Sequence, residues 1–134
     1  MTPAMQSRAD AYARVGVESN VAGSDPHMLI VMLFDGALLK VNMAAIAIVQ
    51  HDIAGKGQAI SKAIEIISNG LKASLDLTAG GELAQRLASL YDYMVSRLLY
   101  ANLESSEGAL KEVATLLGEL KGAWEAIRSE VVPA

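Results

Sequence analysis

The residues of this chain that could carry chemistry are few, and they do not form a catalytic or metal-binding motif. The chain has two histidines, His27 and His51, and no cysteine. Ser24, Asp25 and His27 are the residue types of a hydrolytic triad, but they lie within a single turn. A triad needs its histidine to be oriented by groups from elsewhere in the fold. Neither histidine has a metal-ligand companion at a defined spacing. We therefore expect His27 to have a structural role at the start of a helix.

Three further kinds of site are disfavoured by residue spacing. Gly55-Lys56-Gly57 is not a phosphate-binding loop, because the G-x-x-x-x-G-K-[ST] pattern and a preceding strand are both missing. The carboxylates do not form the Glu-x-x-His pairs of di-iron helical bundles. A histidine phosphotransfer bundle stays as a disfavoured alternative, because neither histidine lies in an H-x-x-K-G context. We predict no enzymatic activity, no metal and no cofactor.

The composition holds more apolar material than one domain needs. The chain has 134 residues, of which 52% are apolar and 19% charged, against about 25% charged residues in a typical soluble domain. Such a chain can fill a core, so disorder is not expected, and its length suits one domain. The apolar surplus predicts contact either with a membrane or with a partner protein.

Charge and aromatic content argue against nucleic acid as that partner. The net charge is −4, and the chain has only one Phe, one Trp and four Tyr, so it offers neither a basic field nor a base-stacking platform. The absence of cysteine fits a reducing cytoplasm. No basic region followed by an apolar run opens the sequence, so no secretory signal is predicted.

Residues 28–49 are apolar and long enough to cross a bilayer. However, Asp35 and Lys40 fall near the middle of this segment, and each would cost about 2.5–3.5 kcal/mol on insertion. Asn42 and Gly36 weaken the segment further. We therefore expect a buried bundle helix and no membrane insertion.

Helical spacing of apolar residues continues almost throughout the chain, and no alternating β-branched run predicts a strand. The first predicted helix runs from Asp25-Pro26 to about Gln50, and the second runs from a cap at Asp52 to residues 78–81. The third begins near Glu82, and the fourth runs from a cap at Ser105-Ser106 to Val131. Their short connections favour antiparallel neighbours. The predicted fold is all-α: an antiparallel up-down four-helix bundle over residues 25–131, preceded by a mobile, partly helical N-terminal arm at residues 1–24.

Each helix is expected to bury one apolar stripe and to expose a polar back. The stripe of the second helix contains Ile60, Ile64, Ile67, Leu71 and Leu75. That of the third contains Leu83, Leu87, Leu90, Met94, Leu98 and Ala101, with Gln85, Ser89, Asp92 and Ser96 opposite. The fourth helix places Leu110, Val113, Leu117, Leu120, Trp124, Ile127 and Val131 three and four residues apart.

Some apolar residues fall outside these stripes. On the third helix, Leu99, Tyr100 and Leu103 continue the polar back, with Tyr93 on the same flank. The first helix is apolar on all sides over Leu29–Phe34. These residues either pack under the N-terminal segment or a second copy of the chain, or form a groove for a partner helix. The two interpretations are compatible, and the sequence leaves both open.

Ordered motifs at matching spacing show that the chain resembles the FliS family of flagellin-specific export chaperones over roughly residues 9–130. The motifs that carry the resemblance are Ala11-Tyr12-Ala13-Arg14-Val15, Val17-Glu18-Ser19, residues 26–37 (PHMLIVMLFDGA), residues 52–57 (DIAGKG), residues 61–64 (SKAI), residues 69–76 (NGLKASLD), Gly80-Gly81-Glu82, residues 90–94 (LYDYM), Arg97-Leu98-Leu99 and Ala101-Asn102-Leu103. Two departures are Asp25, where the family commonly has a small residue, and Ala9, where it often has a larger apolar one.

The resemblance implies a cytoplasmic chaperone that binds the C-terminal segment of flagellin, prevents its premature polymerisation and presents it to the export gate. It also implies a helical bundle with the N-terminal arm near the substrate surface. An adaptor for a regulatory protein of the flagellar system is the alternative, and self-association stays open.

The candidate partner-binding residues come from two sources. The resemblance supplies Tyr12 and Val15, which match the arm motif of the family. The helix faces supply Leu99, Tyr100 and Leu103, followed by Tyr93 and Leu33.

Overall fold

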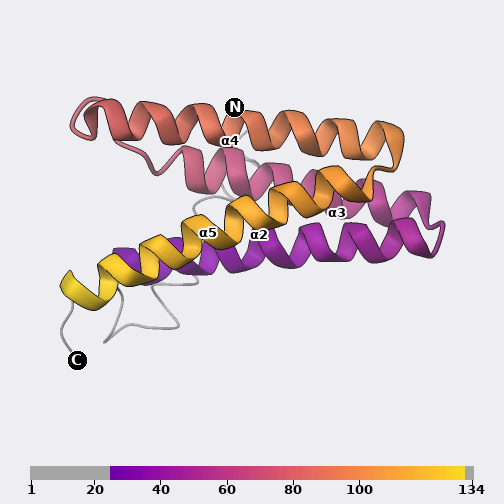
Figure 1. The fold of residues 1–134 in the computed structure, drawn as a ribbon, viewed down its shortest axis with the longest axis horizontal. Coiled ribbons are helices and arrows are strands. Elements are labelled where there is room, and N and C mark those ends of the chain that lie inside the picture. The colour runs from indigo at the N-terminus through magenta and orange to yellow at the C-terminus, as the bar shows by residue number, and fades with distance from the viewer. Residues whose placement is uncertain (1–24, 132–134) are drawn as a thin grey trace, which may run out of the picture.

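The protein forms a bundle of antiparallel helices (Figure 1). The structure, a computed structural model, describes residues 25–131, with side chains up to Ile127. In the labels of Figure 1, the elements are α2 (Pro26–Val49), α3 (Ile53–Glu65), the π-helix η1 (Ile66–Lys72), α4 (Gly81–Glu104) and α5 (Glu107–Val131). Residues 25–131 contain no strand. The predicted all-α bundle is confirmed, whereas the predicted arm at residues 1–24 lies outside the described residues.

Side-chain caps begin α2 and α3 where the sequence predicts them. The Asp25 carboxylate accepts hydrogen bonds from the backbone N–H groups of His27 (2.8 Å) and Met28 (3.3 Å), with proline at the first helical position. The Asp52 carboxylate accepts one from the N–H of Gly55 (2.9 Å). A Cβ atom at Gly55 would lie 2.3 Å from this carboxylate. The glycine therefore leaves room for the cap.

The turn between α4 and α5 is fixed by a buried lysine. Ser105 ends α4 in the left-handed conformation, with φ of 50°. The Lys56 amine, on a side chain only 7% exposed, donates to the Ser105 hydroxyl (2.8 Å). Ser106 then caps α5 by accepting from the N–H of Ala109 (3.1 Å). Because a helix C-terminus favours a nearby cation, Lys56 has a structural role here.

The second predicted helix is wound differently from the expectation of an α-helix. Its C-terminal part is the π-helix η1, in which Ile66, Ile67 and Leu71 are all buried. Residues five apart point about 140° away from each other on an α-helix. The wider winding of a π-helix reduces that angle, so Ile66 and Leu71 can both face the core.

Most of the core lies in the half of the bundle that contains the turn between α4 and α5, and it extends to the groove at Phe34 and Leu71. Its largest fully enclosed side chains are Phe34, Val41, Ile60, Ile67, Leu71, Met94, Leu98, Leu110, Val113 and Leu117. On α5, the buried hydrophobic residues end at Leu117. Figure 1 shows α5 lying close to α4 at the turn that joins them and diverging from it toward the C-terminus. The C-terminal half of α5 therefore lies against α2 rather than closing the bundle.

The predicted stripe of α4 is confirmed except at its first residue. Leu87 and Leu90 are partly buried and pack against the core. Met94, Leu98 and Ala101 are buried, but Leu83 is 67% exposed. The expectation that Leu83 belongs to the core is wrong: it is exposed at the end of the bundle where, within the described residues, α5 has diverged from α4. The polar back is exposed as expected at Gln85, Ser89, Asp92 and Ser96.

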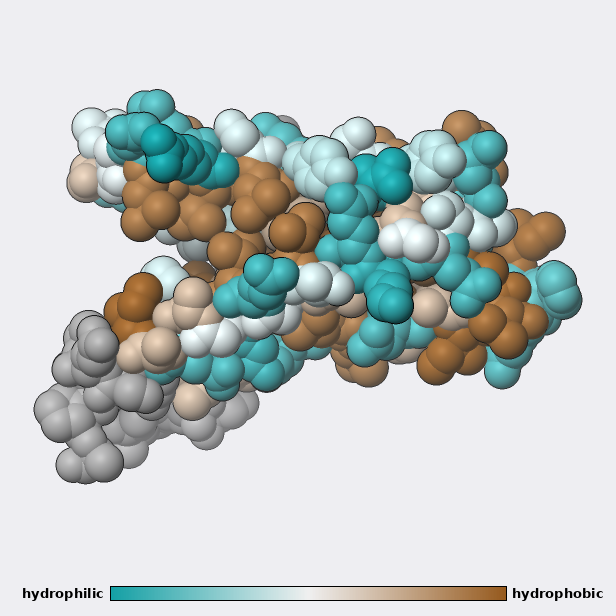
Figure 2. All heavy atoms as spheres, viewed as in Figure 1, coloured by the Kyte–Doolittle hydropathy of each residue, from teal (hydrophilic) through white to brown (hydrophobic). Residues whose placement is uncertain are grey.

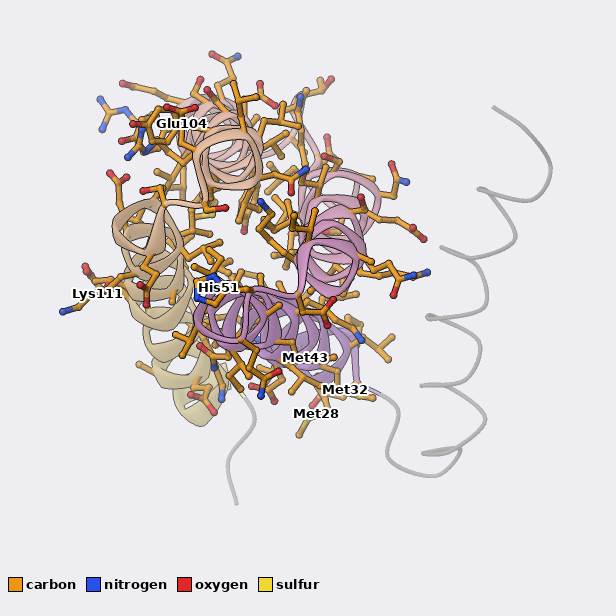
Figure 3. The ribbon with its side chains drawn as sticks, turned by 90° about the vertical axis from the view of Figure 1, so that its right-hand side faces the viewer. Met28, Met32, Met43, His51, Glu104 and Lys111 are labelled. Atoms are coloured by element: carbon orange, nitrogen blue, oxygen red, sulfur yellow. The ribbon has the colours of Figure 1, made fainter. Side chains whose placement is uncertain are left out.

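Among the described helices, α2 alone has the length and apolar composition that could span a membrane. Its inner face nevertheless belongs to the core, with Phe34, Ala37 and Val41 buried. Its outer face exposes a further apolar stripe: Met32, Leu39, Met43 and Ile46. Figure 3 shows Met32 and Met43, together with Met28, on the outward side of α2.

The cap at Asp25 predicts a measurable contribution to stability. We expect Asp25→Ala to lower the free energy of unfolding by about 1 kcal/mol, because two N–H groups of the first turn lose their acceptor. Asp25→Ser, whose hydroxyl can also cap a helix, should retain most of that stability. Urea unfolding followed by circular dichroism measures both variants, and equal losses for alanine and serine would contradict the capping role.

Candidate functional site

The helices that diverge enclose a large apolar groove of about 960 Å³. Figure 2 shows apolar side chains gathered in the hollow between α4 and α5. The main apolar lining residues are Leu29, Ile30, Leu33 and Phe34 of α2, Ile66 and Leu71 of η1, Leu83 and Leu87 of α4, and Leu120, Trp124 and Ile127 of α5. The groove is therefore built from α2, η1, α4 and α5, at the end of the bundle where α5 diverges from α4.

A glycine of η1 lets one wall of the groove form. A Cβ atom at Gly70 would lie 3.0 Å and 3.3 Å from the two methyl carbons of Leu33. The Leu33 side chain thus packs directly over the backbone of η1, and both residues line the groove. Any larger residue at position 70 would push Leu33 into the groove space.

Two contacts attach the outer half of α5 to α2. The rings of His27 and Trp124 stack with centroids 4.6 Å apart, and the indole N–H donates to the backbone carbonyl of His27 (3.2 Å). One turn away, the Lys121 amine pairs with the Asp35 carboxylate at 2.6 Å, and this hydrogen bond raises the pKa of Lys121. The ion pair with Lys121 accounts for the charged residue Asp35 within the apolar helix α2. The stack on Trp124 gives His27 a structural role, as expected.

Tyr91 of α4 is a core residue that also borders the groove. Its side chain is 4% exposed, and burial raises its pKa to about 12. The phenol therefore stays protonated throughout the neutral range and keeps its ability to donate a hydrogen bond.

The predicted binding residues do not form one surface. Leu33 lines the groove. Tyr93, Leu99, Tyr100 and Leu103 are exposed on α4 but are absent from the groove lining. Tyr12 and Val15 lie outside the described residues.

Two of the predicted residues make contacts inside the molecule. The Tyr93 hydroxyl donates to the Glu112 carboxylate (2.5 Å), which also accepts from Arg97 (2.7 Å). The Arg97 guanidinium lies 4.7 Å from the centre of the Tyr100 ring. The Tyr93 and Arg97 hydrogen bonds lower the pKa of Glu112. Tyr93 and Arg97 thus tie α4 to α5 through Glu112, and Tyr100 packs on the Arg97 guanidinium within α4.

Sequence reasoning missed most of the groove. Leu83, Leu87, Trp124 and Ile127 have helical spacing and were therefore expected in the core, yet all four line the groove. Leu87 and Trp124 also pack against the core, whereas Leu83 and Ile127 are 67% and 44% exposed. The available signal was the excess of apolar residues over what a core of this size needs. The helical spacing of apolar residues does not distinguish an apolar stripe that packs against another helix of the bundle from one that is left exposed for a partner.

The chemistry of the site is that of binding. The described residues contain no group of three or more His, Asp or Glu side chains that could hold a metal ion. The groove is lined mainly by aliphatic and aromatic side chains, and it is open to solvent. An open apolar groove in a helical bundle is suited to binding an apolar segment of another chain.

Comparisons with known proteins identify the family. A model of the family "Flagellar protein FliS" matches residues 8–131. The chain is 52% identical over 117 residues to the flagellar secretion chaperone FliS of Salmonella typhimurium, with 87% of each chain covered. It is 45% identical to the FliS chaperone of Escherichia coli, over 86% of this chain and 85% of that one. It is 42% identical to the chaperone FliSB of Pseudomonas aeruginosa, over 87% and 91%. The chain belongs to the FliS family of flagellar secretion chaperones.

The hydrogen bonds to Glu112 predict a pH-dependent contribution to stability. The pKa of Glu112 is lowered from its ordinary value of 4.5 in the folded state. Its stabilising effect is therefore complete above pH 4.5 and is lost as the pH falls through the lower, folded-state pKa. We expect Glu112→Gln to be less stable than the unaltered protein at pH 7, with the difference shrinking below pH 4.5. Chemical unfolding across this pH range measures the difference, and a constant gap from pH 7 to pH 3 would contradict the assignment.

Proposed function

We propose that this protein binds the C-terminal segment of flagellin in the groove between α2, η1, α4 and α5. The observation that carries the proposal is the groove itself, an open apolar surface at the end of the bundle where α5 leaves α4. The family supports it, because relatives are flagellar secretion chaperones. An exposed apolar groove needs an apolar occupant, and an unassembled subunit segment supplies one.

The walls of the groove favour a helical occupant. An amphipathic helix can lay its apolar face against helices on either side, with side chains three and four residues apart as anchors. A client segment that is disordered in solution would fold as it binds, and part of the binding energy would offset its ordering. While bound, its apolar face would be unavailable for polymerisation.

The proposed cycle needs no chemical reaction. The chaperone binds newly made flagellin in the cytoplasm and carries it to the flagellar type III export apparatus. There, release follows from competing affinity for a component of the export gate. Both steps are non-covalent, which agrees with the binding chemistry of the site and with membership of a chaperone family.

Co-expression with the flagellin of the same organism tests the proposal. We expect a stable one-to-one complex that survives size-exclusion chromatography. Flagellin lacking its C-terminal segment should give no complex. A complex that forms equally well with the truncated flagellin would overturn the proposal.

Two leucines of α4 allow the groove to be distinguished from the outer face of the same helix. Leu83 is 67% exposed in the groove, and Leu103 is 80% exposed outside it. We expect Leu83→Asp to weaken binding of a flagellin C-terminal peptide at least about tenfold, because it places a charge in an apolar site. Leu103→Asp should change the affinity less than about twofold. Calorimetric titration measures both.

Because both leucines are largely exposed, neither substitution should lower the unfolding midpoint by much, and this provides the control. The opposite pattern, with Leu103→Asp weakening binding and Leu83→Asp leaving it intact, would move the client site to the Tyr93, Leu99, Tyr100 and Leu103 surface.

The N-terminal arm supplies a further prediction from the family motif. Tyr12 and Val15 match residues of that motif. We expect Tyr12→Ala to weaken binding of the flagellin peptide more than it lowers the stability of the bundle. Calorimetry and urea unfolding on the same variant give the two quantities, and equal peptide affinity for variant and unaltered protein would remove Tyr12 from the site.

A second candidate function uses the outer face of α4. Leu99 and Leu103 are 57% and 80% exposed there, beside Tyr100. This surface could receive a regulatory protein of the flagellar system while the groove holds flagellin. Binding of such a protein should then be independent of flagellin, whereas mutual competition would place both partners in one site.

A further inference from the structure

The groove contains a small number of polar groups, and most of them already have partners. The Ser74 hydroxyl donates to the backbone carbonyl of Leu71 (2.7 Å). The Trp124 indole N–H donates to His27. Glu65 lies 3.7 Å from the Lys62 amine. These three groups thus already make polar contacts inside the molecule.

The hydroxyl of Tyr91 and the side-chain amide of Asn69 differ from them. Both residues line the groove, Tyr91 from α4 and Asn69 from η1. Within residues 25–127, neither side chain has a hydrogen-bond partner. The two unpaired polar groups thus belong to neighbouring walls of one apolar site.

Tyr91 is buried, but its hydroxyl oxygen still reaches solvent. The whole residue is 4% exposed, yet its hydroxyl oxygen is not among the side-chain atoms that are both fully enclosed and without a hydrogen bond in the described residues. The exposed part of Tyr91 therefore includes its hydroxyl. Because Tyr91 lines the groove, this hydroxyl faces the groove. A hydroxyl that reaches solvent can hydrogen-bond to water, and a client that covers it must displace that water.

Loss of that water makes the groove selective. A wholly apolar helix that covered Tyr91 and Asn69 would leave a hydroxyl and an amide desolvated and unpaired, which is costly. A client with a matching polar group replaces the water and avoids this cost. Selection of this kind works by rejecting incorrect partners rather than by adding contacts to the correct one.

We propose that the Tyr91 hydroxyl and the Asn69 amide are the specificity-determining groups of the groove, and that they select a client helix bearing an Asn or Gln side chain within its apolar face. A carboxamide fits both groups, because its oxygen accepts from the phenol while its NH₂ and oxygen complement the Asn69 amide. This inference rests on the proposed function, since it assumes that a helix occupies the groove.

Substitution of Tyr91 by Phe tests the inference, because only the hydroxyl is removed. Two probes are titrated by calorimetry: the flagellin C-terminal peptide, and a designed amphipathic helix with only Leu and Ala on its apolar face. We expect Tyr91→Phe to bind the flagellin peptide about tenfold more weakly and the designed helix severalfold more tightly. Ser96→Ala, which removes a hydroxyl on the exposed polar back of the same helix and outside the groove lining, is the control and should change neither affinity.

Because Tyr91 is also a core residue, Tyr91→Phe could change binding through the stability of the core, and a second variant is therefore needed. Asn69→Leu replaces the amide by an apolar group of similar size, and it should shift the preference in the same direction as Tyr91→Phe. Ser68→Leu, in the same helix but absent from the groove lining, is its control. If both groove variants keep the preference of the unaltered protein between the two probes, the inference is overturned.

The outcome also separates this inference from the proposed function. A third probe, the designed helix with one central Gln in its apolar face, needs no flagellin. If the unaltered protein ignores the flagellin peptide but prefers the Gln-bearing helix over the apolar one, and Tyr91→Phe removes that preference, the flagellin proposal fails and the inference stands. If the flagellin peptide binds equally well to the unaltered protein and to Tyr91→Phe, the inference fails and the flagellin proposal stands.

Discussion

The structure depends on how the packing of the four helices changes along the bundle. At one end, Val41 and Ala44 of α2, Ile60 of α3, Leu98 of α4 and Leu110 of α5 belong to a single buried cluster. Toward the other end, α5 leaves α4 and stays attached to α2 through Trp124 and Lys121. Small residues such as Ala44 allow close helix approach at the first end, whereas no side chain of residues 25–127 fills the gap at the second. Closed packing and an open groove are thus two consequences of one change in helix direction.

This arrangement separates stability from binding. The closed half holds most of the large buried side chains, the Lys56 contact to Ser105 and the Glu112 cluster, which join different helices, whereas Phe34 and Leu71 are buried beside the groove. The open half exposes apolar surface, which contributes little to folding and would contribute strongly to association. A chaperone of this kind can therefore accommodate a client without giving up the contacts that keep it folded. The apolar surplus of the sequence is divided between these two tasks, and the outer face of α2 accounts for a further part of it.

Local features of the sequence predicted the elements well, because their causes are local. The caps at Asp25, Asp52 and Ser106 and the proline at the start of α2 each depend on residues within one turn. The π-helix was not predictable from local pattern. It buries both Ile66 and Leu71, five residues apart, in a core formed with other helices, and that packing is not a local feature of the sequence. The groove was not predictable either. Leu83 and Leu98 occupy equivalent positions on one stripe of α4, and only the direction of α5 makes the first exposed and the second buried. The binding residues expected from the exposed back of α4 came from a valid observation, but that surface is separate from the groove.

The stack of His27 on Trp124 has a spectroscopic consequence. The chain contains one tryptophan, and its indole ring lies in the wall of the groove, 4.6 Å from an imidazole ring and with its N–H donated to a carbonyl of α2. Excitation at the red edge of the protein absorption band therefore reports on one location in the molecule. An occupant that excludes solvent from this ring, or separates it from the imidazole, changes the wavelength and the yield of its emission. The state of the groove can thus be followed in the unlabelled protein, in real time and at low concentration.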